Sequence, residues 1–484
     1  MNSLKKLAGD TALYGLGTIV PRLFNFLLLP LHTAVFHPAD YGIITYLYAF
    51  AAFLNVVYLW GMETAYFRFA TRTGTNARHT FNIALTTVLL VSTLLSVTII
   101  FSADALAGFL KIQNGAKYII WLAFIMWIDA ALAIPFARLR LERRPLHFAT
   151  IKILNIALLV LLNVYFLKLL NLQQPDIGYV FLANLLANAA QLFFFSGTLL
   201  RWRPSLDSHL TPAMLKYATP VMLTGLAGMT NEMFSRITLA WWLPENFYPG
   251  RDARYALGVF GACYKYAVFM NLAVQAFRFA AEPFFFSNAA SRNAPELFAR
   301  VNYYFVMLCS AILVAVSVNL DALRFLLGND QYYEGLVIVP ILLTAYLFLG
   351  VYYNFSVWFK ITDKTYFGTL FTAGGALITV LANYLLIPVL GYVGSALAAL
   401  LCYAGMAAAC YVFGQKYFPA PYTTGKSLLH IVCAVGYSYL VTWYNFESTW
   451  IDHVFHILAT IFYLFLLWAA ERPTMHRPGL PPEK

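Results

Sequence analysis

The chain has 484 residues, of which 61% are hydrophobic and only 11% are charged. Soluble domains carry roughly 25% charged residues, so this composition excludes a water-soluble protein. The net charge of +11 would suit a nucleic-acid-binding protein, but no nucleic-acid-binding motif accompanies it. We therefore expect no nucleic-acid partner, and we interpret the Lys and Arg residues as determinants of membrane topology and as contacts for anionic lipids.

Apolar segments recur along the whole chain, each of about 20 residues, the length that crosses a hydrocarbon core ~30 Å thick. They predict an all-α, polytopic membrane protein with about fourteen transmembrane helices. The first segment has no cleavage site of the A-x-A type, so we expect it to be retained. The predicted spans are 11–36, 41–61, 80–102, 117–138, 148–168, 177–200, 213–240, 255–276, 302–320, 334–358, 365–387, 391–414, 427–444 and 451–470.

Most of the positive charge lies on one side of these spans. If the amino terminus is cytoplasmic, most of the 32 Lys and Arg residues fall in inner segments such as 138–152 and 201–216. An even number of spans then returns Arg472, Arg477 and Lys484 to the same side. The positive-inside rule thus predicts a bacterial inner-membrane protein with both termini in the cytoplasm.

A weak internal repeat of four residues predicts two related halves, with chance similarity in an aromatic-rich chain as the alternative. Phe67-Arg68-Phe69-Ala70 recurs as Phe277-Arg278-Phe279-Ala280, and repeated halves are common in secondary transporters. No loop reaches the ~50 residues of a folded soluble domain, so we expect a protein that is not an enzyme. The predicted parts are a six-span lobe at 1–200, a cytoplasmic linker at 201–212, a six-span lobe at 213–414, and two further helices with a short tail at 415–484.

Three cations lie inside predicted spans: Arg22, Arg236 and Lys265. A charge at the bilayer centre costs at least ~2.5–3.5 kcal/mol, so each should face a wet cavity or a counter-charge. Arg22 suits an anionic substrate group such as a phosphate, or else pairs with a buried acid. Lys265 is flanked by two tyrosines and either faces the cavity or extends to an interface.

Two acids also lie at membrane depth. Glu232 and Arg236 are four residues apart on one helical face, so they either neutralise each other or exchange partners as a switch. Asp129 has no charged neighbour in sequence. A lone buried carboxylate suits a coupling proton, and a partnership with Arg22 or Lys265 is the alternative.

No cofactor is expected. The five cysteines lie in apolar stretches without a C-x-x-C pair, which is typical of buried structural thiols. Asp452, His453 and His456 are grouped at an outer helix start, but the sequence offers no fourth ligand. We therefore predict no metal site.

The opening of the chain resembles the polysaccharide transporter family, which contains the flippases of O-antigen and capsule oligosaccharide lipids. The likeness is carried by Tyr14-Gly-Leu-Gly, Pro21-Arg22, Pro30-Leu31 and Asp40-Tyr41-Gly42, and by the stretch from Tyr264-Lys265 to Phe286, which resembles the Bacteroidetes-type members. It covers essentially the whole chain in span number and loop pattern.

This resemblance implies the fold of the multidrug/oligosaccharidyl-lipid/polysaccharide exporters, with two six-helix lobes around a central cavity and two additional helices. It implies a polyprenyl-pyrophosphate-linked oligosaccharide that alternating access carries from the inner to the outer leaflet. Arg22, Arg236 and Lys265 are the positions that would engage the pyrophosphate. The implied partners are this lipid-linked substrate, membrane lipids and the glycan polymerase machinery.

Three alternatives stay open. An ion-coupled drug or metabolite exporter of the same fold would favour acids in the cavity of the first half, where this chain has Arg22. A peptidoglycan-precursor flippase typically has a cavity richer in arginine. A membrane oligosaccharide polymerase or ligase would need a large outer loop, which the sequence lacks.

Overall fold

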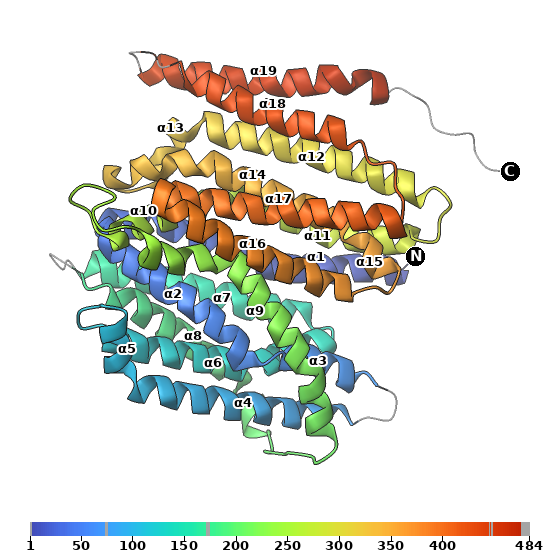
Figure 1. The fold of residues 1–484 in the computed structure, drawn as a ribbon. Coiled ribbons are helices and arrows are strands. Elements are labelled where there is room, and N and C mark those ends of the chain that lie inside the picture. Colours follow the sequence, from blue (N-terminus) through green and yellow to red (C-terminus); the bar gives the residue numbers. More distant parts are fainter. Residues whose placement is uncertain (1, 73–75, 171–174, 445, 447–448, 476–484) are drawn as a thin grey trace. The chain divides into compact units, whose positions relative to one another are not determined.

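The structure, a computed structural model, describes residues 2–72, 76–170, 175–444, 446 and 449–475 (Figure 1), without the side chains of 2–18, 449 and 471–475. Every regular element in these ranges is helical, and eleven helices are long and apolar enough to cross a membrane. The prediction of an all-α, multi-pass membrane protein is confirmed, whereas the count of fourteen spans stays a prediction. The charged side chains Arg472, Arg477 and Lys484 lie outside the described residues.

The chain forms two compact units, and unit 1 comprises Met1–Lys265, Leu327–Gly335 and Tyr366–Cys402. Its first ten helices are consecutive in the chain and are joined by short connections, and one further helix comes from a later part of the chain. They are α1 (Asn2–Val35), α2 (Pro38–Leu59), α3 (Met62–Ala70), α4 (Ala77–Phe101), α5 (Ala103–Phe109), α6 (Ala116–Leu141), α7 (Pro145–Val164, continued by a π turn at Tyr165–Leu169), α8 (Gly178–Leu200), α9 (Leu210–Trp242), α10 (Ala253–Tyr264) and α16 (Tyr366–Leu390).

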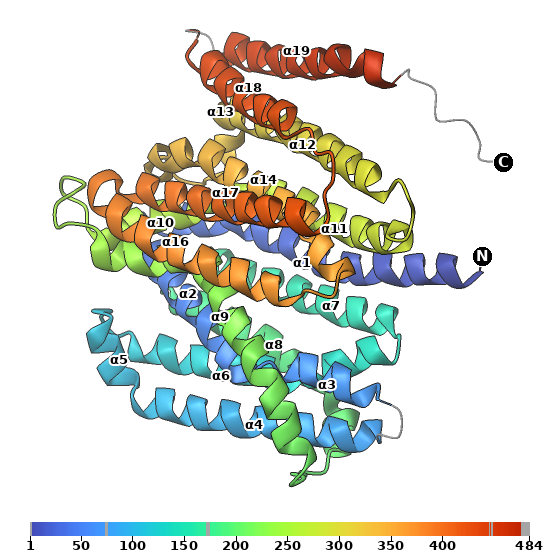
Figure 2. The same ribbon diagram turned by 45° about the vertical axis from the view of Figure 1, so that its right-hand side comes forward.

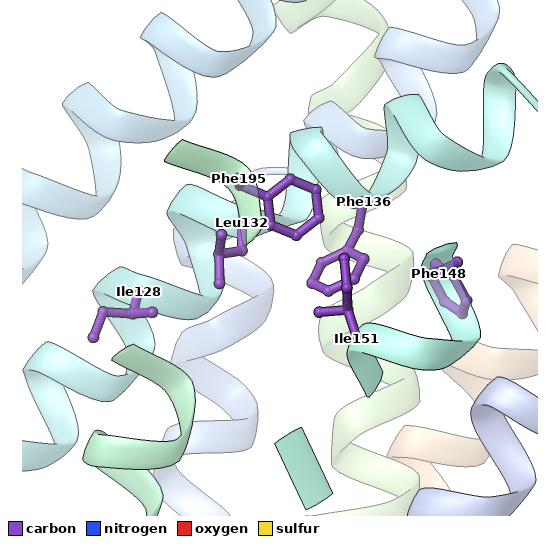
Figure 3. Packing of buried hydrophobic residues seen from close by; sticks show 6 residues of the cluster. All are labelled: Ile128, Leu132, Phe136, Phe148, Ile151 and Phe195. Atoms are coloured by element: carbon purple, nitrogen blue, oxygen red, sulfur yellow. The ribbon is translucent and has the colours of Figure 1, made fainter. Parts of the chain in front are cut away.

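Within unit 1, α1 packs on α7, α7 on α8, α8 on α6, and α6 on α4, as Figures 1 and 2 both show. An aromatic cluster joins α6, α7 and α8 (Figure 3). The ring of Phe136 packs in edge-to-face geometry against the rings of Phe148 and Phe195, with centroid distances of 5.5 and 4.8 Å. Such pairs stabilise beyond the area they bury, so the cluster holds the three helices in one register.

Helices α2 and α10 approach each other through glycine. A methyl group at Gly258 would lie 1.8 Å from the carbonyl oxygen of Pro38, and one at Gly42 would lie 2.0 Å from the carbonyl oxygen of Arg254. Gly261 is similarly crowded by the side chain of Thr45. Small residues allow membrane helices to pack backbone to backbone, and this contact fixes the end of α10 beside α2.

Unit 2 comprises Tyr266–Leu326, Leu336–Thr365 and Tyr403–Lys484. Its core includes Phe285, Phe298 and Val357, and α12 packs against both α18 and α19. The predicted lobes at 1–200 and 213–414 stay a prediction. The helices of unit 2 are α11 (Val268–Asn288), α12 (Ala294–Val318), α13 (Leu320–Leu323), α14 (Val339–Phe355), α15 (Val357–Ile361), α18 (Thr424–Thr442) and α19 (Thr449–Met475), and α17 (Tyr392–Tyr417) is shared with unit 1.

Candidate functional site

Unit 1 contains a cavity of about 330 Å³ lined by residues of α1, α2, α7, α8, α9 and the end of α10. This volume is within the range of ligand pockets. No described residue that lines it is Asp or Glu, whereas two are cations, so the cavity is electropositive. Its polar lining residues are Asn25, His32, Tyr41, Thr45, Tyr48, Asn163, Asn184, Arg236 and Lys265.

Arg236 reaches the cavity from α9. Its guanidinium carbon lies 4.1 Å from the centroid of the Tyr264 ring, a cation–π contact, and its Nη1 touches the sulfur of Met233. Within the described chain it forms no ion pair with Glu232, which is half-buried and does not line the cavity. Stacking on an aromatic face leaves the guanidinium edge available to a ligand.

Lys265 lies where a membrane helix is interrupted. Helix α10 ends at Tyr264, and the 3₁₀ turn Lys265–Ala267 separates it from α11. The Lys265 Nζ lies 5.7 Å from the centroid of the Tyr41 ring. Interrupted helices commonly form the binding sites of transporters, so the backbone break and the cation together mark this position.

A buried histidine that was not predicted as a site residue contributes to the same cavity. The Nε2 of His32 on α1 and the Oδ1 of Asn163 on α7 are 2.8 Å apart, a hydrogen bond in which the donor depends on the tautomer. Two other lining residues are also joined, because Asn184 donates to the Tyr48 hydroxyl at 2.8 Å. The signal for His32 was present in the sequence, because a histidine inside an apolar span needs a polar partner.

The structure does not bring Arg22 into this cavity. Its side chain is exposed on α1, one turn before Asn25, which does line the cavity. Arg236 and Lys265 are therefore the two predicted cations that the structure brings together.

Asp129 lies in a separate pocket of about 370 Å³ in unit 1, with Glu63, Arg140 and Lys152. Its Oδ1 accepts a hydrogen bond from Asn188 at 2.8 Å. Arg140 forms an ion pair with Glu63. The cations that share the pocket of Asp129 are thus Arg140, which is paired with Glu63, and Lys152, rather than Arg22 or Lys265.

Lys152, which was predicted to lie in an inner loop, lies in the second turn of α7, and its Nζ is 4.1 Å from the centroid of the Phe136 ring. Phe136 belongs to the aromatic cluster of Figure 3 and also lines the pocket that Asp129 and Lys152 share. The side chains of Asn155 and Gln191 donate to the Oδ1 of Asn188 at 3.1 and 3.2 Å, which orients that amide toward Asp129.

A third pocket of unit 1, of about 500 Å³, lies at the ends of α4, α6 and α8 and is lined by Arg78, Arg138, Arg144, Arg201 and one acid, Glu142. The Arg138 Nε lies 2.6 Å and the Arg144 Nε 3.5 Å from the carboxylate oxygens of Glu142. Since one acid faces four arginines, this pocket is strongly basic.

Residues 35–314 match the model of a family described as polysaccharide biosynthesis protein. The chain belongs to this family. The family assignment agrees with the resemblance found in the sequence. Comparison with curated proteins finds no match.

Solved structures similar to this polysaccharide biosynthesis protein include the lipid II flippase MurJ in an inward closed conformation, at 13% identity and a TM-score of 0.72 over 96% of this chain and all of that chain. An inward-facing multidrug resistance MATE transporter is 15% identical, with a TM-score of 0.60 over 84% of this chain and 94% of that chain. A transporter from Pyrococcus furiosus, described by the reverse polarity of its binding pocket, is 14% identical, with a TM-score of 0.54 over 89% of this chain and 96% of that chain.

At sequence identities of 13–15%, the similarity to these solved structures shows a shared fold and nothing more. The polysaccharide biosynthesis protein has the fold of MurJ and of the MATE transporters, as the resemblance in sequence implied. The relatives it resembles in structure are named as flippases and transporters rather than as enzymes.

Proposed function

We propose that this protein is a flippase that moves a polyprenyl-pyrophosphate-linked oligosaccharide, a repeat unit of O-antigen or another surface polysaccharide, from the inner to the outer leaflet by alternating access. The observation that carries the proposal is the electropositive cavity at membrane depth, which holds Arg236 and Lys265 and has no acid among its described lining residues. A pyrophosphate in hydrocarbon loses its hydration at high cost, and these two cations replace that water.

The two cations differ in the geometry with which they bind a phosphate. The Arg236 guanidinium is a planar fork that donates two parallel hydrogen bonds to one phosphate, whereas the Lys265 ammonium is a compact charge that suits the second phosphate. The amides of Asn25, Asn163 and Asn184 line the same cavity and are suited to hydrogen bonds with sugar hydroxyls.

The remaining predicted residues do not line the cavity in this structure. We assign Arg22 as a third contact for the anionic group, engaged when α1 bends at Pro21 or Pro30, both of which lie inside that helix. Asp129 and Glu232 are assigned to ion coupling. For Asp129 this is supported by Lys152 in the same pocket, because a proton on the carboxylate would release that cation.

The proposed setting is the bacterial inner membrane, with both termini cytoplasmic and lobes at 1–200 and 213–414 followed by two helices at 415–484. The partners are the lipid-linked substrate, the glycan polymerase machinery and membrane lipids. For the lipids, the basic pocket of Arg78, Arg138, Arg144 and Arg201 supports the proposal, since arginines at span ends attract anionic head groups.

Two other functions of the same fold are separable from this one. One is drug export, since the MATE transporters are named for multidrug resistance; export of a cationic drug would require an acid where the substrate binds, and the described cavity has none. Transport of lipid II, as by MurJ, also involves a lipid pyrophosphate, so only the glycan distinguishes it from our proposal. An enzyme is disfavoured because the structurally similar proteins are named as transporters.

The test is complementation in host cells that lack this gene, with surface glycan as the readout. We expect Arg236→Ala and Lys265→Gln to abolish surface glycan, Arg236→Lys to restore it in part, and Arg22→Ala to reduce it. Arg292→Ala is the control, because Arg292 is exposed and lies outside the cavity. Normal glycan in both cavity variants would contradict the pyrophosphate role.

A further inference from the structure

A cluster in unit 2 brings together three potential metal ligands that the transport proposal does not use. Asp452 and His456 are four residues apart on α19 and therefore share one helical face. Asp321, in α13, faces them from another part of the chain. One ligand atom from each of the three lies within 4.8 Å of the others.

The histidine of this cluster is buried without a hydrogen bond. His456 is 1% exposed, and neither Nδ1 nor Nε2 has a hydrogen-bond partner. Its Nδ1 lies 3.8 Å from Asp452 Oδ2, too far for such a bond. A buried polar group left unsatisfied is costly, so the two nitrogens indicate a ligand that supplies the missing partner.

The negative charge of the cluster indicates that this ligand is positively charged. Asp452 is buried and Asp321 is half-buried, and among the described residues neither forms an ion pair with Lys or Arg. Two carboxylates in an apolar environment need compensation. A divalent cation bound to both carboxylates and a neutral imidazole would leave the cluster with no net charge.

Further hydrogen bonds hold the cluster together. Asn319, two residues before Asp321, donates to Thr460 Oγ1 at 2.9 Å, and that hydroxyl donates to the His456 carbonyl at 2.8 Å. The other carboxylate oxygen of Asp452 accepts the amide of Phe446 at 3.3 Å. The hydrogen bond from Asn319 to Thr460 thus keeps Asp321 beside α19 without using any of the three ligand side chains.

We propose that Asp321, Asp452 and His456 bind a divalent first-row transition ion, with zinc as the preferred ion, which fastens the start of α19 to α13. One imidazole and two carboxylates, with water as a fourth ligand, suit tetrahedral zinc, whereas Mg²⁺ and Ca²⁺ prefer oxygen ligands alone. Zinc holds such ligands at ~2.0–2.2 Å, so binding draws the three side chains closer together. The site is independent of the proposed transport function.

The experiment titrates Zn²⁺ into the purified full-length protein without an affinity tag and counts bound metal by mass spectrometry. We expect one zinc per chain, bound at least about 100-fold more weakly by His456→Ala and by Asp321→Asn. The matched control is His453→Ala, which removes the neighbouring histidine of α19 that is not part of the cluster. We also expect Zn²⁺ to raise the unfolding temperature of the wild type and of His453→Ala, but not of the two cluster variants.

Three results would overturn the site. They are the absence of stoichiometric zinc in the wild type, an equal loss of zinc in His453→Ala and His456→Ala, and binding of Mg²⁺ or Ca²⁺ as tightly as zinc. Unfolding temperatures measured without metal check that Asp321→Asn and His453→Ala are folded, so a lost zinc signal in Asp321→Asn reports on the ligand.

Discussion

The close contact between α2 and α10 makes Gly258→Ala a sharp test of the packing that supports the cavity. The added methyl carbon would lie 1.8 Å from the Pro38 carbonyl oxygen and 3.0 Å from the amide nitrogen of Gly42. Both are backbone atoms, which cannot rotate away. A carbon–oxygen contact normally needs ~3.3 Å, so the two helices must separate by about 1.5 Å.

Overpacking of this kind costs ~1–3 kcal/mol, against a gain of ~0.5–1 kcal/mol for replacing glycine within a helix. We therefore expect Gly258→Ala to lower the free energy of unfolding by about 1–2 kcal/mol. Gly42→Ala should act similarly, and the double variant should cost less than the sum, because one separation of the helices relieves both clashes.

The assay is chaotrope-induced unfolding of the purified protein in detergent, with Gly197→Ala as the matched control. Gly197 lies in α8, and a methyl group there would meet nothing within 4 Å, so its replacement should leave stability unchanged or raise it. If Gly258→Ala proved as stable as Gly197→Ala, the packing described here would be wrong.

Two further predictions concern charges of unit 1. Asp129→Asn keeps an oxygen that accepts from Asn188 but removes the charge next to Lys152, so we expect substrate binding to persist while transport slows roughly tenfold and loses its pH dependence; an unchanged pH profile of transport would exclude Asp129 from coupling. Burial alone raises the pKa of Asp176, but hydrogen bonds from Lys117, Tyr118 and the following backbone hold it below its ordinary value. Because the folded-state pKa is the lower one, this stabilisation is present above the ordinary value of ~3.9 and is lost as the pH falls below it. Asp176→Asn should therefore be less sensitive to acid below about pH 4, an effect that solvent limits to ~1 kcal/mol or less; identical acid-unfolding curves for the two proteins would contradict it.

The helices were predictable because hydrophobic length is a strong signal in a membrane protein. The span predicted at 177–200 corresponds to α8, Gly178–Leu200, and the span at 80–102 to α4, Ala77–Phe101. The interruption at Lys265 was not predictable, since neither proline nor glycine occurs at Tyr264-Lys265-Tyr266.

The partners of the charged residues were harder to predict, because they depend on which helices pack together. Spacing placed Glu232 on the face of Arg236, but the ring of Tyr264 from α10 lies against the guanidinium. Asp321 is far from His456 in sequence, and only the packing of α12 and α19 brings it near. Sequence thus identified Arg236 and Lys265 as cations at membrane depth, but it gave no means of separating them from Arg22.

The central claim is that cations in the cavity of unit 1 bind the pyrophosphate of the substrate. The most direct measurement is the flipping rate of a fluorescent polyprenyl-pyrophosphate-linked glycan in proteoliposomes, comparing the wild type with Arg236→Ala/Lys265→Ala and with the exposed control pair Arg292→Ala/Arg300→Ala. Hydrogen bonds to charged groups contribute ~1.5–3 kcal/mol each, so the cavity variant should flip the lipid roughly 100-fold more slowly or worse, and the control at the normal rate. Equal rates in all three proteins would contradict the account.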